Sequence, residues 1–425
     1  MKSPRLKKIW RYLGPGFITG ASDNDSSAII TYAIAGAKLG TKSLWTMLYI
    51  MPFMIVIQEM SARIGISSSC GLTGNIKKYY SKGLLIFIST LIIVSNTFNI
   101  GADVFGMAAA IEMLMPGSNS ISIYSWLIVF FSIFLIVVLP YRRIVTIFKW
   151  LALSLLTYVL AGLIVINEWP KIIWDTFIPF IPKSKDGLVI LVAIFGTTIS
   201  PYLAFWQASE EAEEEKLKRH EDGKKMACEY RIVTKNELRR ITGDTRIGML
   251  FSNLTGFFII ALTASVLFSA GINNVETVKD AAEALRPLVG DFAYILFGLG
   301  LISSGLLVIP ILAGSSAYVL SEIFNWNEGL DKPFSKAKEF YLIMVIAVFI
   351  GLIIPYAGIS PVKALFWTSI IHGFIAPFLI GTVLHMANNP KIVGPNVNKK
   401  STNLLGYLAF VIMILVLIVF TISFF

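Results

Sequence analysis

The sequence predicts an all-α polytopic membrane protein with about 11 transmembrane helices. Of its 425 residues, 56% are hydrophobic and only 15% carry a charge. Its mean hydropathy of +0.73 lies far above that of soluble domains. Runs of about 18 or more mostly apolar residues, each long enough to cross a bilayer, recur along the whole chain. These observations together exclude a soluble globular fold.

The spans can be placed in order by their hydropathy. The longest hydrophilic stretch between two of them, Gln207 to Arg246, is short for a separate domain, so we expect one integral membrane domain over residues 1–425. The predicted spans are residues 13–37, 44–66, 84–115, 121–140, 144–166, 188–206, 247–270, 292–320, 340–354, 362–384 and 404–425.

The distribution of positive charge predicts the orientation in the membrane. The formal net charge is +10, and most Lys and Arg residues fall on one side if the N-terminus is cytoplasmic. By the positive-inside rule we expect a multi-pass protein of the plasma or inner membrane, with a cytoplasmic N-terminus and an extracellular C-terminus. This arrangement accounts for the basic charge without a nucleic-acid partner. Cys70 and Cys228 then lie in or near cytoplasmic loops, so we expect no disulfide.

The first span contains two aspartates in the stretch GASDNDSSAI, residues 20–29. One aspartate at the centre of a span costs about 2.5 to 3.5 kcal/mol by insertion scales, so Asp23 and Asp25 require compensation. In one interpretation Asp25 caps the second half of a broken helix near Ala28 while Asp23 faces water. In a second the pair holds a cation, and in a third protonated aspartates relay protons or act as catalytic acids. Ser or Asn would cap equally well, so capping does not account for two carboxylates, and we favour the cation.

The sixth span is interrupted in a similar way at GTTISPYL, residues 196–203. Pro201 has no backbone N–H to donate, and Gly196 loosens the helix. Interrupted spans at corresponding positions of two halves are typical of an inverted-repeat transporter that binds its substrate near the bilayer midplane. We therefore expect a LeuT-type inverted repeat of five plus five helices with broken first and sixth helices. The repeats would be residues 13–166 and 188–388, with an additional helix at 404–425.

Every candidate donor at the two breaks is an oxygen. Asp25 and Asp23 supply carboxylates, Thr197 and Ser200 supply hydroxyls, and the unwound backbone adds carbonyl groups. Hard divalent cations prefer such ligands. The breaks therefore predict a site for a transported divalent cation and require no resident cofactor.

An acidic stretch, EEAEEE, directly follows the sixth span. One interpretation is a solvated cytoplasmic helical loop. The other is that Glu210 and Glu211 attract cations to the inner mouth of a pathway.

A family resemblance supports the cation interpretation. GPGFITGASDNDSSAIITYAIAGAKLGTKSLW, followed by VIQEMSARIGI, resembles the start of the NRAMP family of divalent metal transporters. IFGTTISPYLAFWQASEE resembles the sixth span of the NRAMP-related magnesium transporter branch of that family. The similarity in layout covers all the predicted spans. It implies a secondary transporter that works by alternating access, and not an enzyme.

The resemblance implies a set of site residues. Asp25 falls on the metal-binding Asp of the family's Asp-Pro-Gly-Asn motif, and Ala28 falls on its Asn. Ser200 falls on the Met of the Met-Pro-His motif, and Tyr202 falls on its His. Thr197 falls where the family's pattern offers a backbone carbonyl to the metal.

The departures from the family's pattern bear on the choice of metal. Replacing a soft methionine sulfur with the Ser200 hydroxyl favours harder ions, so the pattern predicts Mg²⁺, with Mn²⁺ also carried. Losing an Asn ligand at Ala28 leaves room for a partly hydrated ion, which Asp23 could bind through a water. Gln58 aligns with a family Gln close to the metal, and an interhelical hydrogen bond is an equally good interpretation of it.

Proton coupling is put in doubt by the same comparison. Tyr202 replaces a histidine that helps carry protons in ordinary family members, and of the third-span acids only Asp103 matches. We interpret Asp103 as an outlet or a structural charge. His372 lies alone at mid-span, where a hydrogen-bonded packing role is commoner than proton transfer. A potential of 100 mV supplies about 4.6 kcal/mol to a divalent ion, so uptake needs no proton.

Other classes fit the sequence less well. An intramembrane aspartyl protease needs two carboxylates that share a proton, and Asp23 and Asp25 lie two residues apart on one segment. An amino-acid transporter of the same fold would repel its substrate carboxylate with these aspartates. The main alternative is a proton-coupled Mn²⁺ or Fe²⁺ transporter. The expected partners are the cation and the lipid bilayer, with no obligate protein partner.

Overall fold

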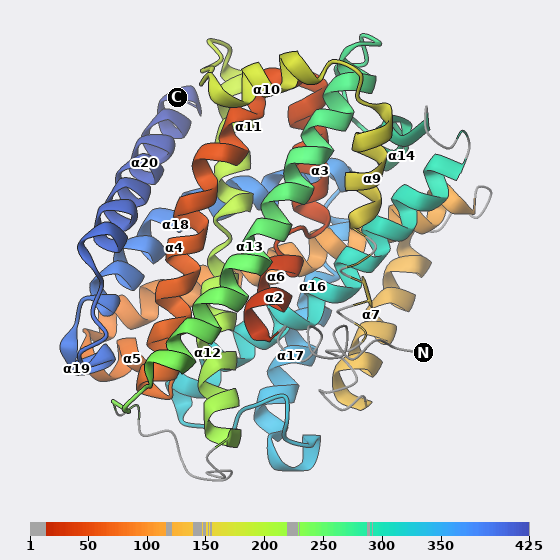
Figure 1. The fold of residues 1–425 in the computed structure, drawn as a ribbon. Helices are drawn as coiled ribbons and strands as arrows, with labels where there is room; N and C mark the ends of the chain where they lie inside the picture. Colours follow the sequence, from red (N-terminus) through yellow and green to blue (C-terminus); the bar gives the residue numbers. More distant parts are fainter. Residues whose placement is uncertain are drawn as a thin grey trace, which may run out of the picture.

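The computed structural model describes residues 14–424 except 116–120, 139–146, 148–149, 152, 154, 219–227, 229, 287–289 and 291. The described part is helical and contains no strand (Figure 1). Its α-helices are α2 (Pro15–Ser22), α3 (Ser26–Leu39), α4 (Trp45–Ser68), α5 (Leu72–Tyr79), α6 (Lys82–Leu114), α7 (Ile121–Val138), α9 (Leu156–Val165), α10 (Trp169–Phe177), α11 (Lys185–Thr198), α12 (Pro201–Lys218), α13 (Lys235–Thr263), α14 (Val278–Ala282), α16 (Phe292–Phe324), α17 (Lys338–Gly351), α18 (Pro361–Ala387), α19 (Pro390–Val393) and α20 (Lys400–Phe424).

The all-helical membrane fold predicted from hydropathy is confirmed. Among the described residues, 9 helices are long and apolar enough to cross a membrane. The first predicted span is divided between α2 and α3, and the fifth contains the shorter apolar helix α9. Where the structure describes them, the predicted spans correspond to helices or to a pair of half-helices. Residue 13, residues 139–140 and most of 144–154 lie outside the described part of the chain.

Local sequence fixes where several helices begin. The α13 helix starts with a capping box in which Thr234 and Glu237 satisfy each other's backbone N–H groups. Ser81 caps α6, and Ser360 caps α18 directly before a proline at the first helical position. Within their apolar runs these helices satisfy their own backbone, which the bilayer requires.

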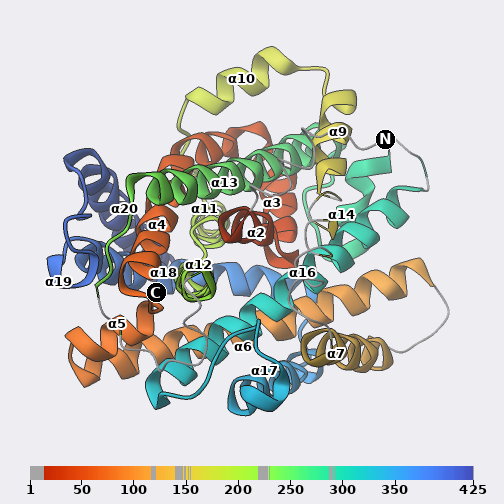
Figure 2. The same ribbon diagram turned by 60° about the horizontal axis from the view of Figure 1, so that its bottom comes forward.

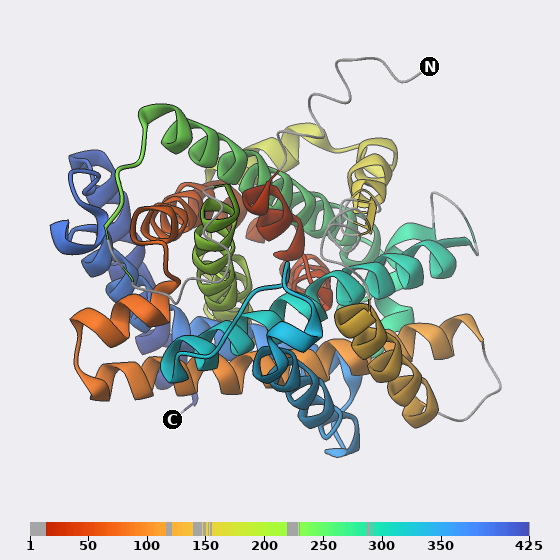
Figure 3. The same cartoon turned by 90° about the horizontal axis from the view of Figure 1, so that it is seen from below.

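The half-helices α2, α3, α11 and α12 lie inside the bundle. Figure 2 shows all four near the centre, and Figure 3, seen from below, shows the red and yellow-green segments enclosed by the other helices. The α2 helix packs on α13, α3 packs on α11, α13 and α18, and α12 packs on α4 and α16. The two chain breaks are therefore shielded from lipid by surrounding helices.

The α2 helix approaches α13 unusually closely through small residues. A Cβ atom on Gly16 would collide with the backbone of Thr245, and one on Gly20 would collide with the backbone of Gly248. Glycines at this spacing allow two helix backbones to touch, as in other membrane helix pairs. The contact therefore depends on the absence of side chains at these positions.

Two elements lie at the periphery. The α20 helix runs along one edge of the bundle, and α10 lies across the end opposite α5 and α19 (Figure 1). The α10 helix is amphipathic and exposes Ile173, Trp174 and Phe177. Such a helix suits the membrane–water interface.

The prediction that Cys70 and Cys228 form no disulfide is wrong for this structure. The two residues are bonded, with Cα atoms 5.1 Å apart and a sequence separation of 158. The Arg231 N–H donates to the Ser67 carbonyl at 2.8 Å, and Lys78 Nζ donates to the Cys228 carbonyl at 2.9 Å. These bonds bring the segment before α13 alongside the α4–α5 connection, a proximity that cysteine spacing does not reveal.

Candidate functional site

The first span is broken at Asp23, Asn24 and Asp25. The α2 helix ends at Ser22, and α3 begins at Ser26 after Asp25 takes an extended conformation (φ −68, ψ 177). The predicted break therefore falls on the two aspartates. Both are almost fully buried, with 1% of Asp23 and 2% of Asp25 exposed.

Asp25 caps α3 and is held by three donors. Its Oδ1 accepts from the Ser27 hydroxyl at 2.6 Å and from the Ala28 N–H at 2.7 Å. Its Oδ2 accepts from Asn99 Nδ2 on α6 at 3.0 Å. The capping interpretation of Asp25 is thus correct as geometry, and it orients the second carboxylate oxygen toward α6.

Asp23 is less well satisfied. Its Oδ2 accepts from the Ser252 hydroxyl on α13 at 2.6 Å, whereas its Oδ1 has no hydrogen-bond partner among the described residues. Leaving a buried polar atom unpaired costs about 1 to 3 kcal/mol, and more for a charged group. This oxygen is therefore an available ligand.

The sixth span is broken beside the first. The α11 helix ends at Thr198 and α12 begins at Pro201, as its sequence predicts. The Ser200 hydroxyl donates to the Thr197 carbonyl at 2.5 Å, so Ser200 lies in the break and Thr197 lies beside it in the last turn of α11. The Ser200 side chain also lies close enough to the Asp23 carboxylate to interact with it.

Two tyrosines join the breaks. The Tyr202 hydroxyl donates to the Ser22 carbonyl at 3.0 Å, which links the start of α12 to the end of α2. The hydroxyls of Tyr32 and Thr198 are hydrogen-bonded at 3.0 Å, which links α3 to α11. Two helix C-termini, each with a partial negative charge, therefore meet near two carboxylates, an arrangement that favours a cation.

Asp103 and His372 lie close to the breaks without hydrogen bonds. Neither carboxylate oxygen of Asp103 and neither ring nitrogen of His372 has a partner among the described residues. Asp103 is an electrostatic neighbour of Ser26, and the His372 ring lies 5.6 Å from the Tyr202 ring. His372 is buried and packs against Tyr202, as its expected packing role requires. The hydrogen bond expected for its ring is not found among the described residues.

The other predicted site residues contribute less to the breaks. Ala28 offers its backbone N–H to Asp25 and has no polar side-chain atom. Gln58 is buried on α4, and its side-chain oxygen has no partner within the described part of the chain. No hydrogen bond joins Gln58 to the described residues of either break.

The interpretation of Glu210 and Glu211 as part of a solvated loop is wrong. The α12 helix continues to Lys218, and both glutamates are only 2% exposed. Glu210 Oε1 accepts from the Tyr318 hydroxyl on α16 at 3.1 Å. The acidic stretch therefore packs against α16, because the broken sixth span places its second half inside the bundle.

Sequence reasoning missed two residues that hold the aspartates. Asn99 binds Asp25, and Ser252 binds Asp23. Asn99 stands in the apolar third span, where a polar side chain is itself a pointer to an internal partner. Ser252 carries no comparable pointer, because serine is common in membrane helices.

The donor set is mixed rather than a cluster of strong ligands. Within the described ranges, no group of three or more His, Cys, Asp or Glu side chains is arranged to hold a metal ion. The two carboxylates, the Thr197 carbonyl and the Ser200 hydroxyl remain as donors. Oxygen ligands with open positions suit a hard ion that keeps part of its water shell.

An open cavity of about 530 Å³ lies between α3, α11 and α18. Its lining includes Lys38 and Lys185 near the surface and the buried side chains of Ile34, Ile190 and Ile370. Ile34 follows Asp25 by about 13 Å along α3. The isoleucines therefore separate this cavity from the aspartates.

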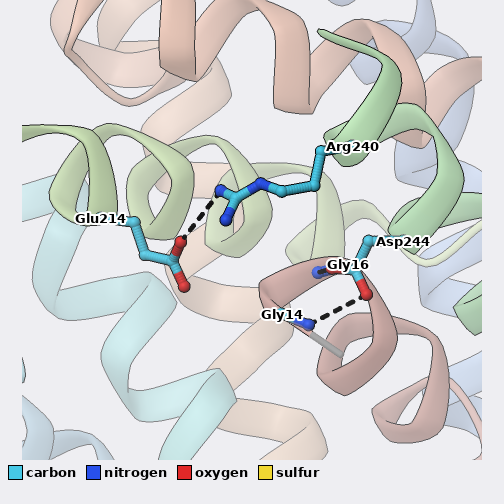
Figure 4. A network of polar contacts seen from close by, with 5 residues as sticks. All are labelled: Gly14, Gly16, Glu214, Arg240 and Asp244. Atoms are coloured by element: carbon cyan, nitrogen blue, oxygen red, sulfur yellow. Dashed lines mark hydrogen bonds and ion pairs between the residues drawn. The ribbon is translucent and has the colours of Figure 1, made fainter. Parts of the chain in front are cut away.

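A polar network lies at the opposite end of the half-helices α2 and α12 from the breaks (Figure 4). Asp244 on α13 accepts from the N–H groups of Gly14 at 3.0 Å and Gly16 at 2.8 Å, so it caps the start of α2. Four residues earlier on α13, Arg240 pairs with Glu214 on α12 at 3.5 Å. The first part of α13 therefore contacts both α2 and α12, the two half-helices that extend from the breaks toward this side.

Comparison with known proteins gives concordant findings. A family model described as natural resistance-associated macrophage protein-like, Nramp, matches residues 16–423. The divalent metal cation transporter MntH of Caldanaerobacter subterraneus subsp. tengcongensis is 24% identical over 401 residues, covering 91% of this chain and 87% of the relative. MntH of Clostridium acetobutylicum is 24% identical over 437 residues, covering 97% and 91%.

Solved structures share the fold. The crystal structure of a manganese transporter from Eremococcus coleocola, in complex with an aromatic bis-isothiourea substituted compound, has a TM-score of 0.74 at 18% identity. The similarity covers 100% of this chain and 88% of that one. MhsT in complex with L-phenylalanine has a TM-score of 0.58 at 12% identity, covering 96% and 98%.

Proposed function

The chain belongs to the Nramp family, and on this premise we propose that it is a secondary transporter of divalent cations in the cell membrane. Mg²⁺ is the preferred substrate and Mn²⁺ is also carried. The observation that carries the proposal is the pair of buried aspartates at a helix break, one of which has an oxygen without a hydrogen-bond partner in the described part of the chain. The named relatives are divalent metal cation transporters, which is consistent with it.

Asp25 is the primary ligand, and Asp23 is the second. Asp25 Oδ2 exchanges its bond from Asn99 for the ion, while Oδ1 remains bonded to Ser27 and Ala28. Asp23 Oδ1, which is unpaired among the described residues, binds the ion directly or through a water. Thr197 and Ser200 complete the oxygen donors from the other break.

The preference for Mg²⁺ rests on the absence of soft donors from these positions. Ser200 offers a hydroxyl where the family's motif has methionine sulfur, and Ala28 offers no side-chain ligand. Softer thiolate and thioether ligands select transition metals, whereas carboxylate, carbonyl and water suit Mg²⁺ and Mn²⁺. A site with few protein ligands also spares Mg²⁺ complete dehydration, which it resists.

Transport proceeds without proton coupling. Tyr202 uses its hydroxyl to hold the Ser22 carbonyl, and neither ring nitrogen of His372 has a hydrogen-bond partner among the described residues. The membrane potential alone supplies about 4.6 kcal/mol per divalent ion at 100 mV.

Two features of the bundle support alternating access. The open cavity between α3, α11 and α18 lies on one side of the site, and the Asp244 and Arg240 contacts hold α2 and α12 to α13 on the other. Movement of α2 and α12 away from α13 would open that side. The α2 helix ends next to Asp23, and α12 begins next to Ser200. Ion binding at these residues is therefore linked to the movement of the two half-helices.

Uptake into proteoliposomes tests the proposal. Vesicles hold a Mg²⁺-sensitive dye, a pH dye is run in parallel, and the potential is set inside negative. We expect Mg²⁺ entry without matching acidification. Asp25→Asn should abolish entry while the protein still folds, because asparagine caps helices as well as aspartate does. Glu339→Gln, which removes an exposed carboxylate at the start of α17, is the control.

Each other result has a definite meaning. Full Mg²⁺ entry in Asp25→Asn would disprove the assigned site. Entry of Mn²⁺ but not Mg²⁺, accompanied by protons, would instead identify a proton-coupled manganese transporter and refute the arguments from Ser200 and Tyr202.

A further inference from the structure

A groove runs along the outer surface of the bundle beside α20. Two cavities of about 510 and 410 Å³ lie there and share Gly381, His385 and Phe410 in their linings. They therefore form one continuous depression between the start of α6, the second half of α18 and α20. We refer to it as the α18–α20 groove.

The two ends of the groove differ in chemistry. One end is lined mainly by apolar side chains, those of Leu84, Pro377, Phe378, Ile414 and Leu417. The other is lined by the polar groups His385, Asn388, Asn389, Lys391 and Tyr407. Of the residues that the structure describes along both cavities, none is Asp or Glu. The groove thus joins an apolar channel to a polar end that is cationic and free of carboxylates.

The depth of the groove matches one leaflet of a bilayer. Tyr407 and Leu417 are separated by about 15 Å along α20, about half of the 30 Å hydrocarbon core. The polar end lies beyond Tyr407, next to α19 and the start of α20. An occupant that follows the groove therefore has its apolar part in the membrane and its polar part at the surface.

The polar end is built around a fixed imidazole. His385 Nδ1 is hydrogen-bonded to the Tyr80 hydroxyl at 2.7 Å, and the two rings lie 5.4 Å apart. This contact leaves Nε2 for an external partner. Lys391 binds through its backbone, with its N–H on Asn389 and its carbonyl accepting from Tyr79. Its ammonium group forms no ion pair with the described residues.

We propose that the α18–α20 groove binds one anionic phospholipid. The headgroup phosphate contacts Lys391 and His385, and an acyl chain lies along Pro377, Phe378 and Leu417. Charge complementarity selects the occupant, because the polar end is cationic and lacks carboxylates. Basic pockets between membrane helices on the cytoplasmic side are suited to such headgroups, and the positive-inside rule predicts that this end is cytoplasmic. The inference does not depend on which ion is transported.

Lipid retention by the full-length protein tests the proposal. Protein purified in mild detergent is incubated with phosphatidylglycerol or phosphatidylcholine of the same chain length, and bound lipid is counted by native mass spectrometry. We expect one phosphatidylglycerol to be retained in preference. Lys391→Gln should lower that retention about fivefold, which is the effect of one cation near an anionic surface.

Two variants and one additional probe make the result specific. Lys338→Gln, at the exposed start of α17, should have no effect. Ile414→Trp should fill the apolar end and reduce retention of both lipids. Equal retention of the two lipids by the natural sequence would overturn the proposal. The proposal would also be overturned if inorganic phosphate alone protected the protein against unfolding, because a free anion would then be the occupant. It would be overturned as well if dimers were detected that disappear in Ile414→Trp, because a second copy of the chain would then be the occupant.

Discussion

Asp25 uses its two oxygens differently, which lets one side chain serve the fold and the ion. Oδ1 accepts from two donors within its own segment, whereas Oδ2 accepts a single bond from Asn99. The cap fixes the carboxylate in place before any ion arrives. Such preorganisation reduces the cost of binding, because the ligand has little freedom left to lose.

Ser200 should control the choice between hard and soft ions. Ser200→Met places a thioether at the break and should raise Cd²⁺ uptake relative to Mg²⁺ by about tenfold, equivalent to about 1.4 kcal/mol. Competition between the two ions in proteoliposomes measures the ratio. Ser200→Ala is the matched control, since it removes the hydroxyl without adding sulfur. An unchanged ratio in Ser200→Met would mean that Ser200 does not face the ion.

Glu328 should make stability depend on pH. Burial raises the pKa of Glu328, between α16 and α17, well above its ordinary value of 4.5, and nearby Glu322 adds to the effect while Lys216 opposes it. Because the pKa of Glu328 is raised in the folded protein, the contribution of protonated Glu328 to folding stability is complete below pH 4.5. This contribution is lost as the pH rises through the pKa that Glu328 has in the folded protein. Glu328→Gln should therefore raise the unfolding midpoint at pH 8 more than at pH 5.

Thermal unfolding in detergent at the two pH values checks this prediction. A change of about 2 to 4 °C is expected for each kcal/mol relieved. Glu339→Gln, an exposed neighbour in the sequence, should leave both midpoints unchanged. A fall in the midpoint of Glu328→Gln at pH 8 would show that the ionised carboxylate stabilises the fold instead.

At the scale of elements, α13 connects the site to the start of α2. Ser252 bonds to Asp23, and Asp244, two turns earlier, caps α2. The same helix pairs with α12 through Arg240 and with α4 through Arg246, which lies 2.5 Å from Glu59. A shift of α13 would thus be felt by both breaks.

Loss of the Asp244 cap should release α2. Asp244→Ala leaves two N–H groups without their acceptor and weakens the α2–α13 contact by about 1 to 2 kcal/mol. A cysteine introduced at Phe17, which is buried on α2, should then react about tenfold faster with a water-soluble maleimide. Asp280→Ala is the control, because Asp280 caps α14 in a comparable way. Equal labelling rates in both variants would mean that Asp244 does not hold the gate.

The helices and breaks were predictable where they depend on residues close together in the sequence. Hydropathy predicted the spans, and the aspartates and Pro201 predicted both breaks. The continuation of α12 was not predictable, because EEAEEE has the composition of a solvated segment. Its burial depends on contacts with α16, 100 or more residues away, such as the bond from Tyr318 to Glu210 at a separation of 108. Propensity and pattern do not encode such a partner.

The candidate site was predictable only in part. Asp23, Asp25, Thr197 and Ser200 were identified because they interrupt apolar runs, and they do lie at the breaks. Ser252 was missed because it interrupts nothing. The disulfide between Cys70 and Cys228 was missed because the expectation came from the compartment, whereas the pairing comes from the folded path of the chain.

At the scale of the whole molecule, the orientation in the membrane remains a prediction. Alkaline phosphatase fused after Phe425 should be active, and the same enzyme fused at Asn396, between α18 and α20, should be inactive. Fluorescent protein fusions at these two points should give the opposite pattern, because that reporter folds in the cytoplasm. The reverse result at both points would place the N-terminus outside and invert the assignment of the two cavity ends.

The burial of both aspartates determines the size of the electrical current that transport would produce. Among the described residues, buried isoleucines lie between Asp25 and the open cavity on one side, and the close α2–α13 contact lies on the other. Each ion must wait for a rearrangement of helices, which takes microseconds to seconds. At about 10³ cycles per second one molecule would pass about 0.3 fA, far below a single-channel current, so only large populations would give a measurable signal.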